Sequence, residues 1–217
     1  MLASLEGYEG DDFTSRVKAA DADNVCLQCV GWSAPASDLN FQYYVWVAAC
    51  VVVELDLLLG ETVVLSADIQ YDCGNQLNAF VDVGQIEGAF VMGLGYWLTE
   101  RVTVDDGDGK LLTNGTWEYK PPMALDIPVE MNVRLLTDSP NSLEGNVLRS
   151  KATGEPPLIA SSACFFAVRD AILQGYQGFG RGDDEQAWSL SAPATVDARG
   201  DALQGLYDSG STFYKVV

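Results

Sequence analysis

The chain has 217 residues, of which 48% are apolar and 20% are charged, so it is long and apolar enough to fold around a core. Its 12 basic and 31 acidic residues give a net charge of −19, which argues against a protein that binds nucleic acid backbones or anionic membranes. The chain contains no histidine, which excludes a Ser-His-Asp triad and a His-ligated metal site built from its own residues.

Neither a membrane span nor a secretory signal is predicted. The longest apolar run, Tyr43 to Leu59, is interrupted by Glu54 and Asp56 and does not reach the roughly 18–20 residues that cross a bilayer. The first 12 residues hold four acidic and no basic side chains, whereas a secretory signal begins with a basic segment. We therefore expect a cytoplasmic protein.

The five cysteines do not make a complete metal site. Cys26 and Cys29 have CxxC spacing, but no second pair and no histidine completes a zinc site. Asn24 to Trp32 alternates as a strand does, which would place the two sulfurs on opposite faces. An odd number of cysteines fits buried thiols in a reducing compartment.

The first half of the chain predicts a helical remnant and then a hairpin. Arg16 to Ala22 is the remnant, after an acidic start. Phe41 to Leu58 and Glu61 to Tyr71 are rich in β-forming residues and flank a tight turn at Leu59 and Gly60. Two such runs around a glycine turn predict an antiparallel β-hairpin.

Asn75 to Val83 is interpreted as a short helix or a turn, and a glycine-rich helix is predicted from Gly84 to Glu100. Its four glycines each cost about 1 kcal/mol relative to alanine, so something must pack very close to the backbone. Two interpretations are open: the helix packs on a sheet, or a bulky ligand lies against it and Gln85, at its N-terminal end, supplies an amide.

The second half predicts a turn-rich segment, a strand and two helices. Arg101 to Leu112 reads as a second hairpin, whose acidic turn lacks the spacing of a calcium loop. The remaining elements are an irregular segment over 117–128, a strand over 129–136, a helix from 158 to about 175 and a short helix ending near 206.

One carboxylate, Glu155, stands in a short loop between Gly154 and two prolines. Gly154 permits backbone angles that other residues avoid, and Pro156 is expected to hold Glu155 in an extended conformation. A carboxylate held stiffly before a buried helix is a candidate general base. The alternative is a surface glutamate in a proline-rich turn.

Five motifs stand out along these elements: 84–90, 119–122, 135–141, 150–158 and 191–195. In this order they resemble a Gly-Gln-x-Glu-Gly-Ala-Phe helix, a Tyr-Lys-Ile-Pro turn, a strand end with its loop, a Ser-Lys-x-x-Gly-Glu-Pro-Pro loop and a closing Ser-Pro-Ala-Thr. Those are motifs of the C-terminal part of the molybdenum-binding region in the xanthine dehydrogenase and aldehyde oxidase family.

The resemblance implies an α+β fold, with antiparallel β-hairpins and strands packed against a Gly-rich helix and a C-terminal helix, as part of a second molybdopterin-binding domain. It implies that Glu155 is the general base, which takes a proton from a Mo-bound hydroxide that attacks a purine or aldehyde carbon. Gln85, Gly84 and Gly154 become cofactor-binding residues, where backbone amides could approach the anionic pterin. No residue of this chain is expected to ligate the metal.

The chain also departs from that family. The family's large subunit is several times longer, and its Gly-rich loop over the metal and its substrate-gripping Arg and Glu have no counterpart here. The resemblance therefore implies that molybdenum–molybdopterin is shared with an N-terminal part, and that Fe–S clusters and FAD belong to other domains. We expect a ragged acidic N-terminus over residues 1–15, the molybdopterin-binding portion over 16–207 and a tail over 208–217.

Three interpretations remain open. The chain is the C-terminal portion of a molybdenum hydroxylase that is inactive alone, a truncated and inactive fragment, or one subunit of a split enzyme whose partner chain carries the rest of the site. The family is usually homodimeric. Exposed apolar surface is expected where the rest of the family's subunit would sit.

Overall fold

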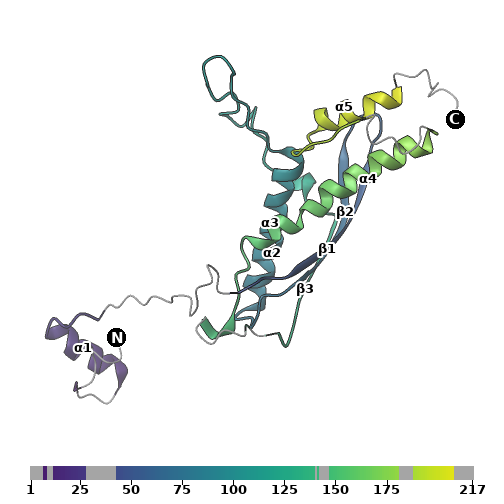
Figure 1. Ribbon diagram of the computed structural model, residues 1–217. Helices are drawn as coiled ribbons and strands as arrows, with labels where there is room; N and C mark the ends of the chain where they lie inside the picture. The colour runs from purple at the N-terminus through teal and green to yellow at the C-terminus, as the bar shows by residue number, and fades with distance from the viewer. Residues whose placement is uncertain are drawn as a thin grey trace. The chain divides into compact units, whose positions relative to one another are not determined.

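The computed structural model describes residues 7–8, 12–27, 43–139, 141, 147–180 and 188–207 (Figure 1). The chain divides into two compact units, Met1–Gln42 and Tyr43–Val217. In the first unit the predicted helical remnant is confirmed as α1 (Phe13–Ala22), which starts three residues earlier because Asp12 caps it. The predicted strand is not formed over residues 24–27, and residues 28–32 and the predicted tail lie outside the described residues.

The second unit is built on a three-stranded sheet in the order β1-β2-β3. β1 (Val47–Leu55) and β2 (Thr62–Tyr71) pair in antiparallel register, which confirms the predicted hairpin. Gly60 in their connection has a φ of +69°, in the left-handed region that favours glycine. β3 (Glu130–Leu135) pairs with β2 in parallel, whereas antiparallel strands were expected. A long connection containing a helix lies between β2 and β3, and parallel pairing requires such a crossover.

Helices cover one face of this sheet (Figure 1), so the predicted α+β fold class is confirmed. They are α2 (Ala79–Leu94), with its π-helical continuation Gly95–Thr99, α3 (Pro156–Ala160), α4 (Ser162–Gly178) and α5 (Val196–Tyr207). The core forms between the inner face of the sheet and these helices, with Tyr71, Phe90 and Ile172 fully buried. The other face of the sheet is open, since alternate residues of each strand are exposed.

Asn78 determines where α2 begins. Its side-chain oxygen accepts hydrogen bonds from the amides of Phe80 and Val81, at 3.0 and 3.4 Å. This N-cap starts the helix at Ala79, five residues before the predicted start. Gln85 therefore lies in the second turn and not at the N-terminal end. Backbone amides at this position belong to the helix's own hydrogen-bond ladder, so they are not free to bind an anion.

The helix predicted from residue 158 begins at Pro156 and is interrupted at Ser161. Prolines at its first two positions are compatible with a helix start, because the amides there have no partner within the helix. Within the described residues, Pro156–Gly178 is the one stretch long and apolar enough to cross a membrane. Its residues Cys164, Val168 and Ile172 are buried in the core, so the apolar composition is explained by packing inside the protein.

The opposite end of the unit is held by a buried cation. Arg199 of α5 is 4% exposed and donates hydrogen bonds to the carbonyls of Gly60, at 2.5 Å, and Ala194, at 2.6 Å. Burial lowers the pKa of Arg199 to about 10. The Arg199 guanidinium thus joins α5 to the turn of the β1–β2 hairpin, far from the elements described next.

Candidate functional site

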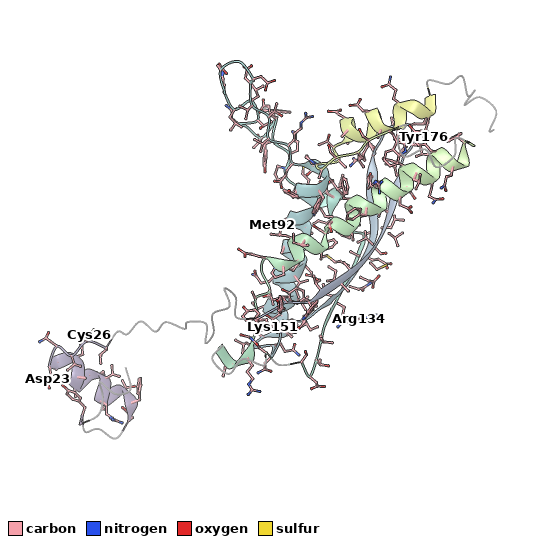
Figure 2. All side chains as sticks on the ribbon, viewed as in Figure 1. Asp23, Cys26, Met92, Arg134, Lys151 and Tyr176 are labelled. Atoms are coloured by element: carbon pink, nitrogen blue, oxygen red, sulfur yellow. The ribbon has the colours of Figure 1, made fainter. Side chains whose placement is uncertain are left out.

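The loop that carries Glu155 is anchored at its start to the end of β2. The Lys151 amide donates to the Cys73 carbonyl at 2.8 Å, and the Lys151 Nζ lies 2.5 Å from Oδ2 of Asp72. These two side chains are 10% and 4% exposed, so the ion pair is almost completely removed from water. Figure 2 shows Lys151 at the end of the sheet opposite Tyr176.

Two tyrosines hold the next residue of the loop. The Tyr71 hydroxyl donates to the Ala152 carbonyl at 2.6 Å, and the Ala152 amide donates to the Tyr43 hydroxyl at 3.1 Å. Burial raises the pKa of Tyr71, so this hydroxyl remains protonated as the donor. Gly74 completes the anchor: its φ is +65°, and a Cβ there would lie 2.6 Å from the Arg149 carbonyl oxygen.

Helix α2 contacts the far end of the loop through two residues one turn apart. Burial raises the pKa of Asp82, and the nearby Thr153 side chain opposes the rise. The Oδ2 atom of Asp82 is buried and has no hydrogen-bond partner among the described residues. Gln85 follows, with its Oε1 atom 3.0 Å from where a Cβ of Gly154 would stand. Two predicted cofactor-binding residues, Gln85 and Gly154, therefore come together.

Glu155 is exposed and forms the N-cap position of α3. Its φ and ψ are −116° and −38°, so the expectation of an extended conformation is wrong. The Glu155 carbonyl accepts a hydrogen bond from the amide of Leu158 at 3.0 Å. This bond closes the first turn of α3 and outweighs the preference for an extended conformation that Pro156 imposes on the residue before it. The Glu155 carboxylate makes no cap and has no hydrogen bond or ion pair with any described residue, so it is available to accept a proton.

Gly154 serves a different purpose from the one predicted. It does not adopt a positive φ. Instead, the Gln85 side chain occupies the space at its α-carbon, and a larger residue would push that amide away. The glycine is therefore explained by close approach, and not by backbone freedom.

The glycines of the α2 segment divide into two pairs. Gly93 and Gly95 are packed: a Cβ would lie 2.8 Å from the Leu158 carbonyl oxygen at the first and 2.7 Å from Pro122 at the second. Nothing described lies within 4 Å of a Cβ at Gly84 or Gly88. Helix packing thus explains the first pair only, and Gly84 and Gly88 leave open space on the helix turns that include Gln85.

Exposed apolar residues continue the row of Gly84 and Gly88. Phe80 precedes the two glycines and Met92 and Tyr96 follow them, all at intervals of four residues, and the three side chains are 91%, 69% and 64% exposed. Residues four apart are neighbours on a helix surface, so these five form one slanted row along the helix. We call Phe80, Gly84, Gly88, Met92 and Tyr96 the α2 stripe.

Alanine substitutions separate the packed glycines from the open ones. Gly93→Ala is expected to destabilise the chain by about 1–3 kcal/mol, since its Cβ would overlap Ser161 and Leu158. Gly88→Ala is the matched control and is expected to stabilise it by about 0.5–1 kcal/mol, because alanine is the better helix former and meets no neighbour. Urea unfolding measures both. Equal effects at the two positions would contradict this division.

The sequence did not reveal the groups that hold the site residues in place. Tyr43, Tyr71 and the Asp72–Lys151 pair were not selected as site residues, and neither was Asp82, whose buried Oδ2 atom has no hydrogen-bond partner among the described residues. Asp82 could have been found, because it lies three residues before Gln85 on the same helix. Among the described residues, no cluster of Cys, Asp and Glu could hold a metal ion. The arrangement offers one free carboxylate and one amide beside an open helix face.

Comparisons with known proteins agree on one family. Residues 8–128 match the model of the molybdopterin cofactor-binding domain. The chain is 40% identical over 185 residues to indole-3-acetaldehyde oxidase of Arabidopsis thaliana, covering 83% of this chain and 14% of that protein. It is 38% identical over 195 residues to xanthine dehydrogenase/oxidase of Mus musculus, covering 89% of this chain and 14% of that protein.

Solved structures show the same fold. The aldehyde oxidoreductase from Desulfovibrio desulfuricans ATCC 27774 superposes with a TM-score of 0.64 at 21% identity, covering 93% of this chain and 21% of that one. Quinoline 2-oxidoreductase from Pseudomonas putida 86 superposes with a TM-score of 0.58 at 26% identity, covering 72% of this chain and 18% of that one. The chain thus spans about one seventh of the curated relatives and about one fifth of these structures.

Proposed function

Because this chain belongs to the molybdopterin cofactor-binding domain family, within the xanthine dehydrogenases and aldehyde oxidases, we propose that it forms one wall of a molybdenum hydroxylase active site. In this site Glu155 is the general base, and Gln85, Gly84 and Gly154 contact the molybdopterin cofactor. The substrate is an aldehyde or a purine, the two classes that the relatives' names indicate.

One observation carries the proposal: a free carboxylate and a free amide, from distant parts of the sequence, meet at one anchored loop. Gln85 of α2 lies against Gly154, and Glu155 is the next residue. A general base must stand within hydrogen-bond reach of the proton that it takes, and its position must be fixed before the substrate arrives. Three contacts on Lys151 and Ala152, from Tyr43, Tyr71 and Asp72, supply that rigidity.

The residues present fit a molybdopterin in part. Gly84 and Gly88 leave the surface of α2 open, so a flat ring system could lie along the helix beside the exposed Gln85. The Gln85 amide can donate to and accept from the ring nitrogens and oxygens of a pterin. Lys151 is already paired with Asp72 and is not available to the cofactor's phosphate. We infer that another polypeptide segment supplies the charge that balances the phosphate.

The chemistry then divides between the cofactor and this chain. When bound, the molybdenum cofactor supplies the redox centre that accepts electrons from the oxidised carbon. Glu155 accepts the proton that the reaction releases at the attacking oxygen. Gln85 orients the cofactor, and the anchored loop keeps Glu155 at a constant distance from it. Fe–S clusters and FAD would reside in other domains.

The α2 stripe supports a further polypeptide beside this chain. It presents large apolar side chains to solvent, and such surfaces mark interaction sites. We infer that the stripe is covered by the segment that completes the site, whether in the same polypeptide or in a partner chain. The holoenzyme would then be a cytoplasmic assembly, homodimeric as is usual in the family.

Molybdenum analysis distinguishes the proposed enzyme from an inactive fragment. Protein purified from its natural source is expected to contain about one molybdenum per copy of this chain, together with the polypeptide segment that completes the site. The measurement is elemental analysis combined with mass spectrometry of the purified material. Folded chain without molybdenum and without a companion segment would favour the inactive fragment. Molybdenum with a separate companion chain would identify a split enzyme.

A further inference from the structure

The segment that follows the α2 stripe folds into a hairpin of its own. Val104 and Leu111 form an antiparallel bridge, which lies between two backbone hydrogen bonds of 2.8 and 2.9 Å. The turn is closed by Asp105, whose Oδ1 atom accepts hydrogen bonds from two amides of the turn at 2.8 and 3.2 Å. The second hairpin predicted from the sequence is therefore present, and we call residues 101–117 the arm.

The arm is almost entirely exposed. Within residues 101–112 every side chain except that of Thr103 is exposed, and Trp117 is 85% exposed. In Figure 1 the arm, drawn in teal, extends away from the sheet and the helices. A two-stranded hairpin alone is at best marginally stable in water. Its exposed aliphatic side chains therefore mark a surface that another polypeptide covers; they are Val102, Val104, Leu111 and Leu112.

The base of the arm is fixed to the end of the α2 segment. The Tyr119 hydroxyl donates to the Glu100 carboxylate, and the Glu100 amide donates to the Gly95 carbonyl at 2.7 Å. Gly95 has no room for a side chain, since a Cβ there would lie 2.7 Å from Pro122. The arm thus leaves a fixed base shortly after Tyr96, the last member of the α2 stripe. A companion segment that covers the stripe would meet the arm next.

Charge at the tip of the arm selects the kind of surface that it can enter. The tip carries three carboxylates, those of Asp105, Asp106 and Asp108, and one cation, that of Lys110. A second copy of this chain, with its net charge of −19, would repel such a tip. An apolar groove rimmed with lysine or arginine would accept it. This chain spans about one seventh of its curated relatives, so an enzyme of their length has ample further chain to provide that groove.

One face of the arm carries the apolar side chains that such a groove would bury. Val104 and Leu111 lie opposite each other at the bridge, and Val102 is two residues from Val104, so the three share a face. We propose that the arm is a clasp, whose apolar face enters a groove with lysine or arginine at its far end, on the polypeptide segment that completes the active site. This inference rests on the proposed function for the existence of that segment.

Photo-cross-linking in the assembled enzyme tests the clasp. The photoreactive residue p-benzoylphenylalanine replaces Val104 or, for reference, Met92 of the α2 stripe, and mass spectrometry locates the adducts. We expect both positions to cross-link to polypeptide outside residues 1–217, and the Val104 adduct to lie in a stretch that contains lysine or arginine. Val104 adducts without Met92 adducts would support the clasp and remove the stripe from the interface.

The two positions separate failure of the clasp from failure of the proposed function. Met92 adducts to outside polypeptide without any at Val104 would overturn the clasp and leave the proposed function in place. Val104 adducts only to a second copy of this chain would also overturn it, as would adducts in a stretch without basic residues. Adducts to outside polypeptide at neither position would remove the companion segment and, with it, both proposals.

Hydrogen exchange provides a second route that needs no photoreactive residue. Exchange of the amides of residues 103–112 is expected to be at least about 100-fold slower in the assembled enzyme than in the isolated chain. Asp106 makes no hydrogen bond or ion pair with a described residue, so Asp106→Lys leaves the hairpin intact. It should speed exchange in the assembled enzyme about tenfold at low salt, because it reverses a charge that faces basic side chains.

Asp201→Lys is the matched control, since it makes the same change of net charge at an exposed position of α5. It should leave exchange of the arm unchanged. Equal exchange in the isolated chain and in the assembled enzyme would overturn the clasp. An equal effect of the two lysine variants, or no effect of Asp106→Lys, would overturn the charge match that identifies the groove.

Discussion

Glu155→Gln is expected to lower kcat of the molybdenum-loaded enzyme by about 10²- to 10⁴-fold, the usual contribution of a positioned general base. Glutamine has nearly the same size as glutamate but cannot accept the proton. The thermal unfolding midpoint should be unchanged, because the Glu155 side chain is exposed and makes no cap or hydrogen bond with a described residue. Steady-state turnover with an aldehyde and with a purine provides the measurement.

Glu130→Gln is the matched control for this prediction. Glu130 is an exposed glutamate at the start of β3 and lies on the open face of the sheet. Its replacement also removes one negative charge from a chain of net charge −19, so it corrects for any general electrostatic effect. Undiminished turnover in Glu155→Gln would refute the role of Glu155, and an equal loss in both variants would assign the effect to overall charge.

The sequence was sufficient for the elements that depend on local patterns. The hairpin from Val47 to Tyr71 was predicted because β-rich runs flank a glycine turn. The parallel pairing of β3 was not predicted, because it depends on the path of the chain between Tyr71 and Glu130. The start of α2 was misplaced, because the capping side chain of Asn78 was overlooked beside the more prominent glycines.

The candidate site was only partly predictable, for a related reason. Gln85, Gly154 and Glu155 were identified through motifs, and their proximity in space agrees with that choice. Their supports are long-range pairs: Asp72 with Lys151, Tyr71 with Ala152 and Tyr43 with Ala152. No local pattern signals a contact between residues so far apart in the chain. The same limitation applies to Gly154, whose role became clear only when its neighbour in space was known.

Lys151→Met is expected to destabilise the second unit by about 3–5 kcal/mol, since it leaves the Asp72 carboxylate buried without its cation. The Asp72 Oδ1 atom would still accept from the Gly74 amide at 3.0 Å, but Oδ2 would lose its 2.5 Å partner. Urea unfolding followed by tryptophan fluorescence provides the measurement. Lys110→Met, a replacement of an exposed lysine in the turn near residue 108, should change stability by less than about 0.5 kcal/mol.

Adding Asp72→Asn to Lys151→Met should recover at least half of that loss, which separates the cost of a buried charge from the loss of lysine packing. Asparagine keeps an acceptor for the Gly74 amide and carries no charge to desolvate. A double variant as unstable as Lys151→Met alone would show that packing of the lysine side chain dominates. Lys151 begins the Glu155 loop, and only three residues separate it from Glu155. Recovery of stability without recovery of turnover would therefore show that the ion pair also holds this loop in its working position.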